Sequence, residues 1–118
     1  MKEQFSAKML SIHFTEADKW DGKPLHEALV HLCHEQGLFG AIVYRGIEGF
    51  GASARIYHAR SLSISKHAPV MATIIGKEDQ IQKILLHLDR MIDGGLVVSS
   101  AVDVIHYSKS GESPSATK

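Results

Sequence analysis

At 118 residues the chain is long enough for one domain and too short for two ordinary ones. Thirteen basic residues balance thirteen acidic ones, so no net charge draws the protein to nucleic acid or to an anionic membrane. A single cysteine excludes an intramolecular disulfide, and no apolar run approaches the roughly 20 residues that span a bilayer. Because residues 1–7 are polar and resemble no secretion signal, we expect a cytoplasmic protein.

The first expected strand covers residues 8–14, where apolar and polar side chains alternate. Leu10, Ile12 and Phe14 point to one side, which is typical of a half-buried strand. The preceding residues 1–7 are expected to form a flexible N-terminus.

The first helix is expected over residues 24–36. Pro24 suits its first turn, and Gly37 is a natural C-cap. One apolar stripe recurs at helical spacing along it: Leu25, Ala28, Leu29, Leu32 and Cys33. Because the Cys33 thiol lies on this stripe, we expect it to be buried and inert.

The β-rich segment 40–47 predicts a second strand, and three glycines then follow within six residues: Gly46, Gly49 and Gly51. Such a density of glycine is costly inside a strand, so we expect a functional loop over residues 46–55. β character returns over residues 56–64.

Residues 69–75 form a continuous apolar run that favours a central strand. A second helical stripe then runs from Ile81 to Ile92 and ends at two glycines.

The last strand is expected over residues 96–107, with an interruption near Ser99 and Ser100. Residues 108–118 have almost no apolar side chains, and we expect a disordered tail.

The element order predicts an α+β domain over residues 8–107 with ferredoxin-like split βαβ (βαββαβ) topology. Its antiparallel sheet would carry both helices on one face. The strands have apolar residues on both parities, for example Met9 and Leu10. A monomer would therefore expose a large apolar face, which soluble monomers rarely do, and we expect a homo-oligomer.

Three segments resemble the bacterial and archaeal domain of unknown function 190 family: residues 16–25, 37–41 and 45–56. The run Arg-Gly-Ile-Glu-Gly-Phe-Gly is the most specific of these, and the resemblance covers residues 8–107. That family is similar to the PII-like signalling proteins. The resemblance implies a homotrimer that binds small ligands, chiefly adenine nucleotides, in clefts between subunits.

In PII relatives a long loop after the second strand closes over the ligand and contacts partners. The glycine-rich run of this chain lies at that position, and the short turn at Gly94 and Gly95 lies where PII proteins place a longer phosphate-contacting loop. The regulated partner would then be a membrane transporter or another protein.

The glycine-rich loop is the strongest candidate site. Glycines let backbone amides approach an anion, and two flanking arginines can hold phosphate oxygens in bidentate fashion. A wide turn would explain the same glycines, and Phe50 would either stack on a base or pack at a subunit interface. The candidate ligand-binding residues are Arg45, Gly46, Gly49, Phe50, Gly51, Arg55 and His58, then Asp18, Lys19 and Trp20 at the first strand-to-helix turn, and Gly94 and Gly95.

Two alternatives to a sensor of a small anion stay open. Glu27, His31 and His34 have a spacing that can chelate a divalent ion, although a solvated helix face explains it as well. An enzyme acting on a phosphorylated small molecule would need a general base near the arginines, for which His58 and Glu48 are close in sequence. The chain has no nucleophile elbow, Walker lysine motif or paired-carboxylate signature, so we expect no enzyme.

Overall fold

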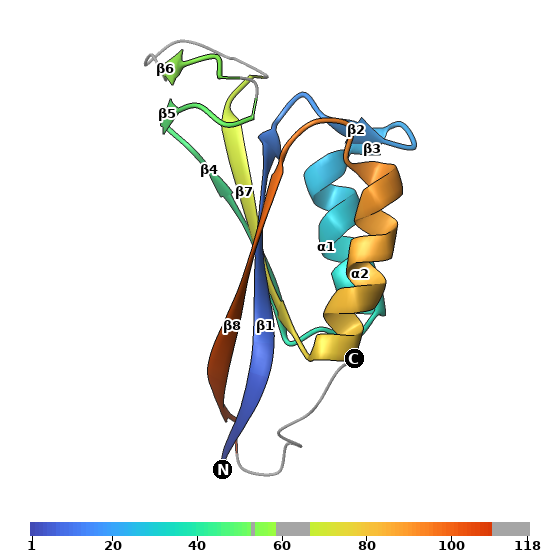
Figure 1. Ribbon diagram of the computed structural model, residues 1–118, viewed down its shortest axis with the longest axis vertical. Helices are drawn as coiled ribbons and strands as arrows, with labels where there is room; N and C mark the ends of the chain where they lie inside the picture. Colours follow the sequence, from blue (N-terminus) through green and yellow to red (C-terminus); the bar gives the residue numbers. More distant parts are fainter. Residues whose placement is uncertain (53, 59–66, 110–118) are drawn as a thin grey trace.

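The computed structural model describes residues 1–52, 54–58 and 67–109 of the chain. A four-stranded antiparallel sheet has the strand order β4-β7-β1-β8, and both helices pack on one of its faces (Figure 1). This arrangement is the ferredoxin-like fold with βαββαβ topology, and the predicted fold class is confirmed. The long elements are β1 (Lys2–Thr15), α1 (Leu25–Glu35), β4 (Gly40–Arg45), β7 (Pro69–Gly76), α2 (Glu78–Met91) and β8 (Leu96–Tyr107).

Two short hairpins extend beyond the ends of the sheet strands. The pair β2 (Lys19–Trp20) and β3 (Lys23–Pro24) lies between β1 and α1, and the pair β5 (Glu48–Gly49) and β6 (Tyr57–His58) lies between β4 and β7. Neither helix in the described part of the chain is long and apolar enough to cross a membrane.

The face of the sheet that carries the helices, called the covered face, forms the core. Leu10, Ile12 and Ile74 on this face are almost completely buried. They pack against the apolar stripes of the two helices, which contribute Leu25, Leu29 and Cys33 from α1 and Ile81, Ile84, Leu88 and Met91 from α2. The alternation predicted for β1 and the helical periodicities therefore both point into one core.

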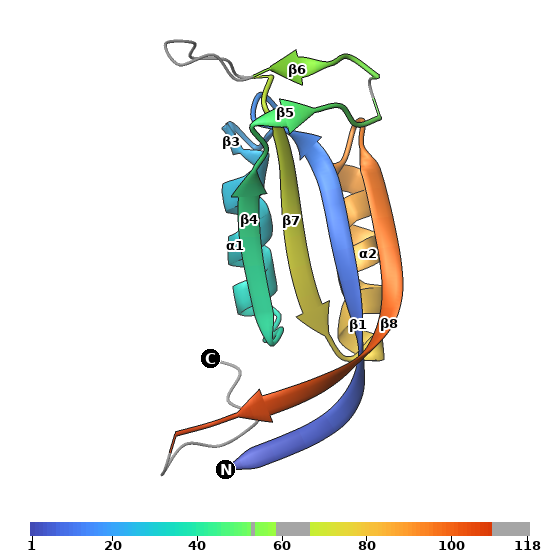
Figure 2. The same cartoon turned by 90° about the vertical axis from the view of Figure 1, so that its left-hand side faces the viewer.

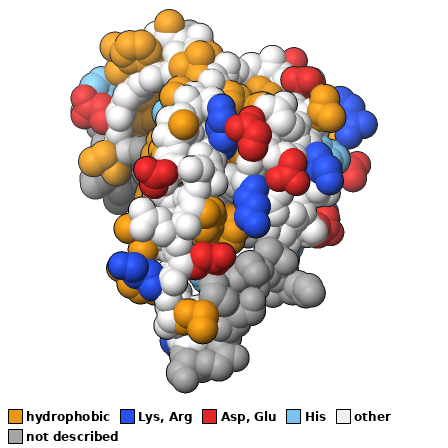
Figure 3. Space-filling model, turned by 60° about the horizontal axis from the view of Figure 1, so that its bottom comes forward, with side chains coloured by type: hydrophobic (Ala, Val, Ile, Leu, Met, Phe, Trp, Pro, Cys, Tyr) orange, Lys and Arg blue, Asp and Glu red, His pale blue; other side chains and the backbone are white. Residues whose placement is uncertain are grey.

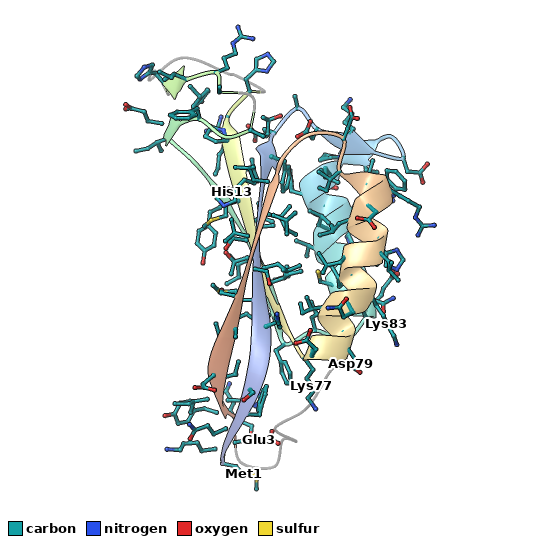
Figure 4. The ribbon with its side chains drawn as sticks, in the orientation of Figure 1. Met1, Glu3, His13, Lys77, Asp79 and Lys83 are labelled. Carbon is teal, nitrogen blue, oxygen red and sulfur yellow. The ribbon has the colours of Figure 1, made fainter. Side chains whose placement is uncertain are left out.

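The opposite face, called the open face, is formed by the other parity of the same strands. The register places Met71 beside both Tyr44 and His13, and His13 in turn beside Leu96. His13 lies on the side of the sheet away from the helices (Figure 4). The larger apolar side chains of this face are Met9, Ile42, Tyr44, Met71, Ile75, Leu96 and Val98.

The N-terminal segment is part of the sheet, and the prediction that the first strand begins at residue 8 is wrong. β1 begins at Lys2 and pairs with β8 in an unbroken register from Lys2↔Tyr107 to His13↔Leu96. Ser99 and Ser100 pair with Leu10 and Met9, so the predicted interruption of the last strand is also wrong. Polar residues are tolerated here because backbone pairing, not side-chain burial, holds a two-stranded ribbon.

The part of this ribbon beyond the sheet, residues 2–7 with 102–107, bends beneath the lower ends of β7 and β4 (Figure 2). It meets the turn between α1 and β4. There the rings of Phe5 and Phe39 have their centroids 4.7 Å apart, and the Phe39 and His106 rings are 6.1 Å apart. The ribbon is therefore anchored to the domain by an aromatic contact.

Two sequence predictions fall partly outside the described residues. Of the expected strand over residues 56–64, only Tyr57 and His58 are described as strand, and residues 59–64 lie outside the described part. Residues 110–118 of the expected tail also lie outside it. Ser108, by contrast, exchanges backbone hydrogen bonds with Met1, at 2.9 and 3.1 Å.

Candidate functional site

A cavity of about 340 Å³ lies at the end of the sheet where β1 ends and β8 begins. We call it the strand-end cavity. Four segments that are distant in sequence line it: His13, Phe14, Thr15 and Asp18; Gly49, Phe50, Gly51, Ala52, Arg55 and Tyr57; His67 and Pro69; and Asp93, Gly94 and Gly95. The fold thus brings the predicted glycine-rich loop and the predicted Gly94-Gly95 turn to one site.

The β5–β6 hairpin forms one wall of the cavity. Gly49 pairs with Tyr57 and has φ +146°, a conformation that favours glycine. Gly46 anchors the hairpin to β7: its N–H donates to the Pro69 carbonyl at 2.7 Å, and a Cβ on Gly46 would lie 2.8 Å from Pro69 Cγ. Gly46 therefore has a packing role and does not line the cavity.

The turn before β8 forms the opposite wall. A Cβ on Gly95 would lie only 2.5 Å from the His13 carbonyl oxygen, so any other residue would push β8 away from β1. A Cβ on Gly94 would meet nothing within 4 Å. Gly95 is thus required by the close approach of two strands, and Gly94 presents open backbone to the cavity.

Asp18 closes the loop that follows β1. Its Oδ2 accepts a hydrogen bond from the Thr15 N–H at 2.9 Å, and its carbonyl accepts one from the Leu25 N–H at 2.9 Å. These bonds tie the end of β1 to the start of α1. A carboxylate that lines the cavity is therefore held in a fixed position.

The two predicted arginines are in different environments. Arg55 lines the strand-end cavity. Arg45 does not line it, because its Nε donates to Glu16 Oε1 at 2.9 Å in an ion pair. Glu16, with a smaller contribution from Tyr57, raises the pKa of Arg45 above its usual value. Arg45 is thus placed to support the cavity wall at Tyr57.

Three other predicted residues also lie away from the cavity lining. His58 lies beside Glu48, with Nδ1 and Oε2 3.6 Å apart, so the two groups considered as a general base face each other. Lys19 is exposed, and Trp20 lies in a separate groove over the helices.

Eight lining residues were not predicted: His13, Phe14, Thr15, Ala52, Tyr57, His67, Pro69 and Asp93. His13 had one sequence signal, since it is the last residue on the second face of the strand predicted over residues 8–14. No local sequence pattern marked Tyr57, His67 or Asp93 as members of one site.

The lining combines groups suited to a small, flat anion. The Arg55 guanidinium and the two histidines can donate to anionic oxygens. Phe50 and Tyr57 offer aromatic surface, and the glycines leave backbone amides accessible. Asp18 and Asp93 can accept hydrogen bonds from hydroxyl or amino groups of the same ligand.

The alternative metal site on α1 gains no geometric support. Within the described residues, no three His, Cys, Asp or Glu side chains lie close enough to hold a metal ion, which covers Glu27, His31 and His34. Cys33 is buried in the core, and its burial raises the pKa of the thiol to about 11. The burial that its place on the apolar stripe predicted is confirmed.

Comparison with known proteins identifies relatives across most of the chain. Residues 7–104 match the DUF190 family, described as "Uncharacterized ACR, COG1993". A UPF0166 protein from Aquifex aeolicus (strain VF5) is 31% identical over 84% of this chain and 93% of its own length.

Solved structures with the same fold are PII-like. CPII from Thiomonas intermedia K12 bound to ADP and bicarbonate has 18% identity and a TM-score of 0.59, over 87% of this chain and 90% of CPII. The apo form, described as a nitrogen regulatory PII-like protein, has 16% identity and a TM-score of 0.60, over 91% and 100%. At these identities the likeness shows a common fold.

Proposed function

The chain belongs to the DUF190 family, and we propose that it is a PII-like regulatory protein that binds a small anionic ligand in the strand-end cavity. The observation that carries the proposal is the convergence of the glycine-rich hairpin, the Gly94 turn and Arg55 on that cavity. The protein would act by binding and not by catalysis.

The ligand we propose is an adenine nucleotide. Its phosphates would meet the Arg55 guanidinium and the backbone amides at Gly49, Gly51 and Gly94, and its base would stack on Phe50. The fold is shared with a protein that has been solved with ADP, which supports this choice of ligand class.

The functional unit in this proposal is a homotrimer. The open face carries Ile42, Tyr44 and Val98, all of which remain exposed in a single chain. Exposed apolar side chains gathered on one face favour association, and the resemblance to PII-like proteins implies three copies.

The regulated partner would bind the β5–β6 hairpin. Ile47, Phe50 and Ile56 are all strongly exposed there, which is unusual for a loop that has no partner. We propose that ligand binding changes the presentation of these side chains to a membrane transporter or another regulated protein.

Calorimetry with ATP, ADP and AMP on the full chain tests the ligand. Arg55→Ala should weaken nucleotide binding by roughly 10- to 100-fold, the range of a lost charge-assisted hydrogen bond. Arg45→Ala should have a smaller effect, because Arg45 pairs with Glu16 outside the cavity lining.

Lys83→Ala on α2 is the control and should leave nucleotide affinity unchanged. Unchanged affinity in Arg55→Ala would remove the strand-end cavity as the site. Failure of all three nucleotides to bind or to raise the melting temperature would refute the ligand class.

A further inference from the structure

A second groove lies on the outer surface of the helices, remote from the strand-end cavity. Its volume is about 250 Å³, and it is bounded by α1, α2 and the β2–β3 hairpin. This volume is below the roughly 300–1,000 Å³ of pockets that hold drug-sized ligands. The helical groove therefore suits a small molecule.

The β2–β3 hairpin fixes Trp20 at the end of the groove. Trp20 pairs with Lys23 across a two-residue turn, where Asp21 and Gly22 have φ of 54° and 77°. Positive φ at both turn positions is typical of a tight type I′ hairpin, and Asp-Gly is a preferred sequence for it. The indole is 39% exposed and lines the groove.

The interior of the groove is apolar, with Ala28 and Leu32 from α1 and Met91 from α2. With Trp20, these side chains offer a hydrophobic contact to one part of a ligand. An apolar surface with a few polar groups around it is the usual composition of a small-molecule site.

Charges of both signs surround this apolar surface. Lys23 and Arg90 lie toward the hairpin, as does Asp21 in its turn. Glu35 is the last residue of α1, at the far end of that helix (Figure 1). None of the ion pairs found among the described residues joins these side chains to one another. Arg90 does contact His87, with Nη2 and Nδ1 3.3 Å apart, which steadies it beside the groove.

The helical side of the molecule as a whole mixes acidic and basic side chains (Figure 3). The groove differs from that surface because its opposite charges line a common hollow with an apolar interior. A ligand that carries one positive group, one negative group and an apolar part would use all three features.

We propose that the helical groove binds a small zwitterion, an α-amino acid with an apolar side chain. Its carboxylate would face Arg90 and Lys23, its ammonium would face Glu35, and its side chain would contact Trp20 and the apolar interior. Binding at this site does not depend on the ligand of the strand-end cavity.

Trp20 is the only tryptophan of the chain, so intrinsic fluorescence reports directly on the groove. We expect L-leucine to change the emission of the full-length protein and to give a saturable binding curve, checked by calorimetry. N-acetyl-L-leucine, which lacks the ammonium, and L-leucinamide, which lacks the carboxylate, should each bind about tenfold more weakly.

Matched variants test which side chain faces each charged group of the ligand. Glu35→Gln should weaken L-leucine about tenfold and leave N-acetyl-L-leucine unchanged, and Arg90→Gln should weaken L-leucine about tenfold and leave L-leucinamide unchanged. Asp79→Asn removes a carboxylate at the other end of α2, outside the groove lining, and should change nothing (Figure 4).

The proposal is overturned if L-leucine does not bind, if both derivatives bind as well as L-leucine, or if the Glu35 and Arg90 variants keep full affinity. Arg55→Ala should leave L-leucine affinity intact, and Glu35→Gln should leave nucleotide affinity intact. The proposals for the two sites can therefore be refuted independently of each other.

Discussion

On the covered face of the sheet, Ile74 is 1% exposed and packs against both helical stripes. On the open face, Ile42 belongs to the neighbouring strand and is 58% exposed. The two residues have the same side chain but lie on opposite faces of the sheet, and Ile42 also lies on the edge strand β4, whereas Ile74 lies on the interior strand β7. The difference shows that alternation along a strand determines which face a residue joins, whereas burial depends on what packs against that face.

The largest effect is expected when a charge is placed on the open face. Ile42→Lys should dissociate the proposed trimer to single chains, because an unpaired ammonium cannot be buried at low cost. Light scattering should show the mass fall about threefold. Leu86→Lys, at an exposed position on α2, is the control and should remain a trimer. A trimeric Ile42→Lys protein would mean that the open face is not the interface.

Truncating each isoleucine to alanine compares how much the two side chains contribute to the free energy of unfolding. Ile74→Ala should lower the free energy of unfolding by about 2–5 kcal/mol, because it leaves a cavity in the core. Ile42→Ala should lower it by less than about 0.5 kcal/mol, as for a surface position. Both are to be measured by urea denaturation in a Tyr44→Lys background, which we expect to be monomeric. Equal losses would show that the two faces are packed alike in the single chain.

The thiol on the covered side gives a chemical measure of the same burial. Burial raises the pKa of Cys33 from its ordinary 9.0 to about 11, so the thiolate fraction at pH 8 falls about 100-fold. A disulfide reagent should therefore react at least about 100-fold more slowly with the native chain than with the chain in denaturant. Rapid reaction of the native protein would contradict a buried Cys33.

The sign of the pH effect on stability follows from the same shift. The folded chain keeps the Cys33 proton up to pH about 11, whereas the unfolded chain loses it near 9.0. This contribution to stability is complete below pH 9 and is lost as the pH rises toward 11. A Cys33→Ala variant should lack that decline, whatever its stability at neutral pH.

The smallest expected effect concerns the ribbon. There, side chains of β1 that have the same parity as those of the open face are covered. Ala7 lies on that parity and is nonetheless buried, and Phe5 contacts Phe39. A double-mutant cycle with Phe5→Ala and Phe39→Ala should give a coupling of about 0.5–1.5 kcal/mol. The pair Phe5→Ala and Leu86→Ala should be additive, and additivity in the first pair would mean that the ring contact does not hold the ribbon.

The sequence predicted the elements whose burial is periodic. The stripes of α1 and α2, the alternation after Lys8 and the apolar run of β7 all reflect one core, so the fold class followed from them. The ribbon was missed because residues 2–7 are paired and not buried as a set. Their partners lie at the far end of the chain, and no local pattern reports such pairing.

The candidate site was predicted mainly where glycine marked it. Gly49, Gly51 and Gly94 line the strand-end cavity as the loop and turn predictions implied. Asp18 and Trp20, two residues apart, were grouped together, yet the β2–β3 hairpin sends Trp20 to the helical groove. Arg45 was expected to bind ligand, but Glu16, 29 positions away, accepts its hydrogen bond.

The pairing of β1 with β8 has a consequence for how the chain folds during synthesis. β1 is made first and lies in the interior of the sheet, yet its longest partner is the last strand to emerge. Contacts in this ribbon reach a sequence separation of 107, and such non-local pairing slows folding because the loop must close first. Until β8 is available, one edge of β1 is unpaired and can pair with another nascent chain. The ribosome-bound intermediate should therefore be the form most vulnerable to aggregation.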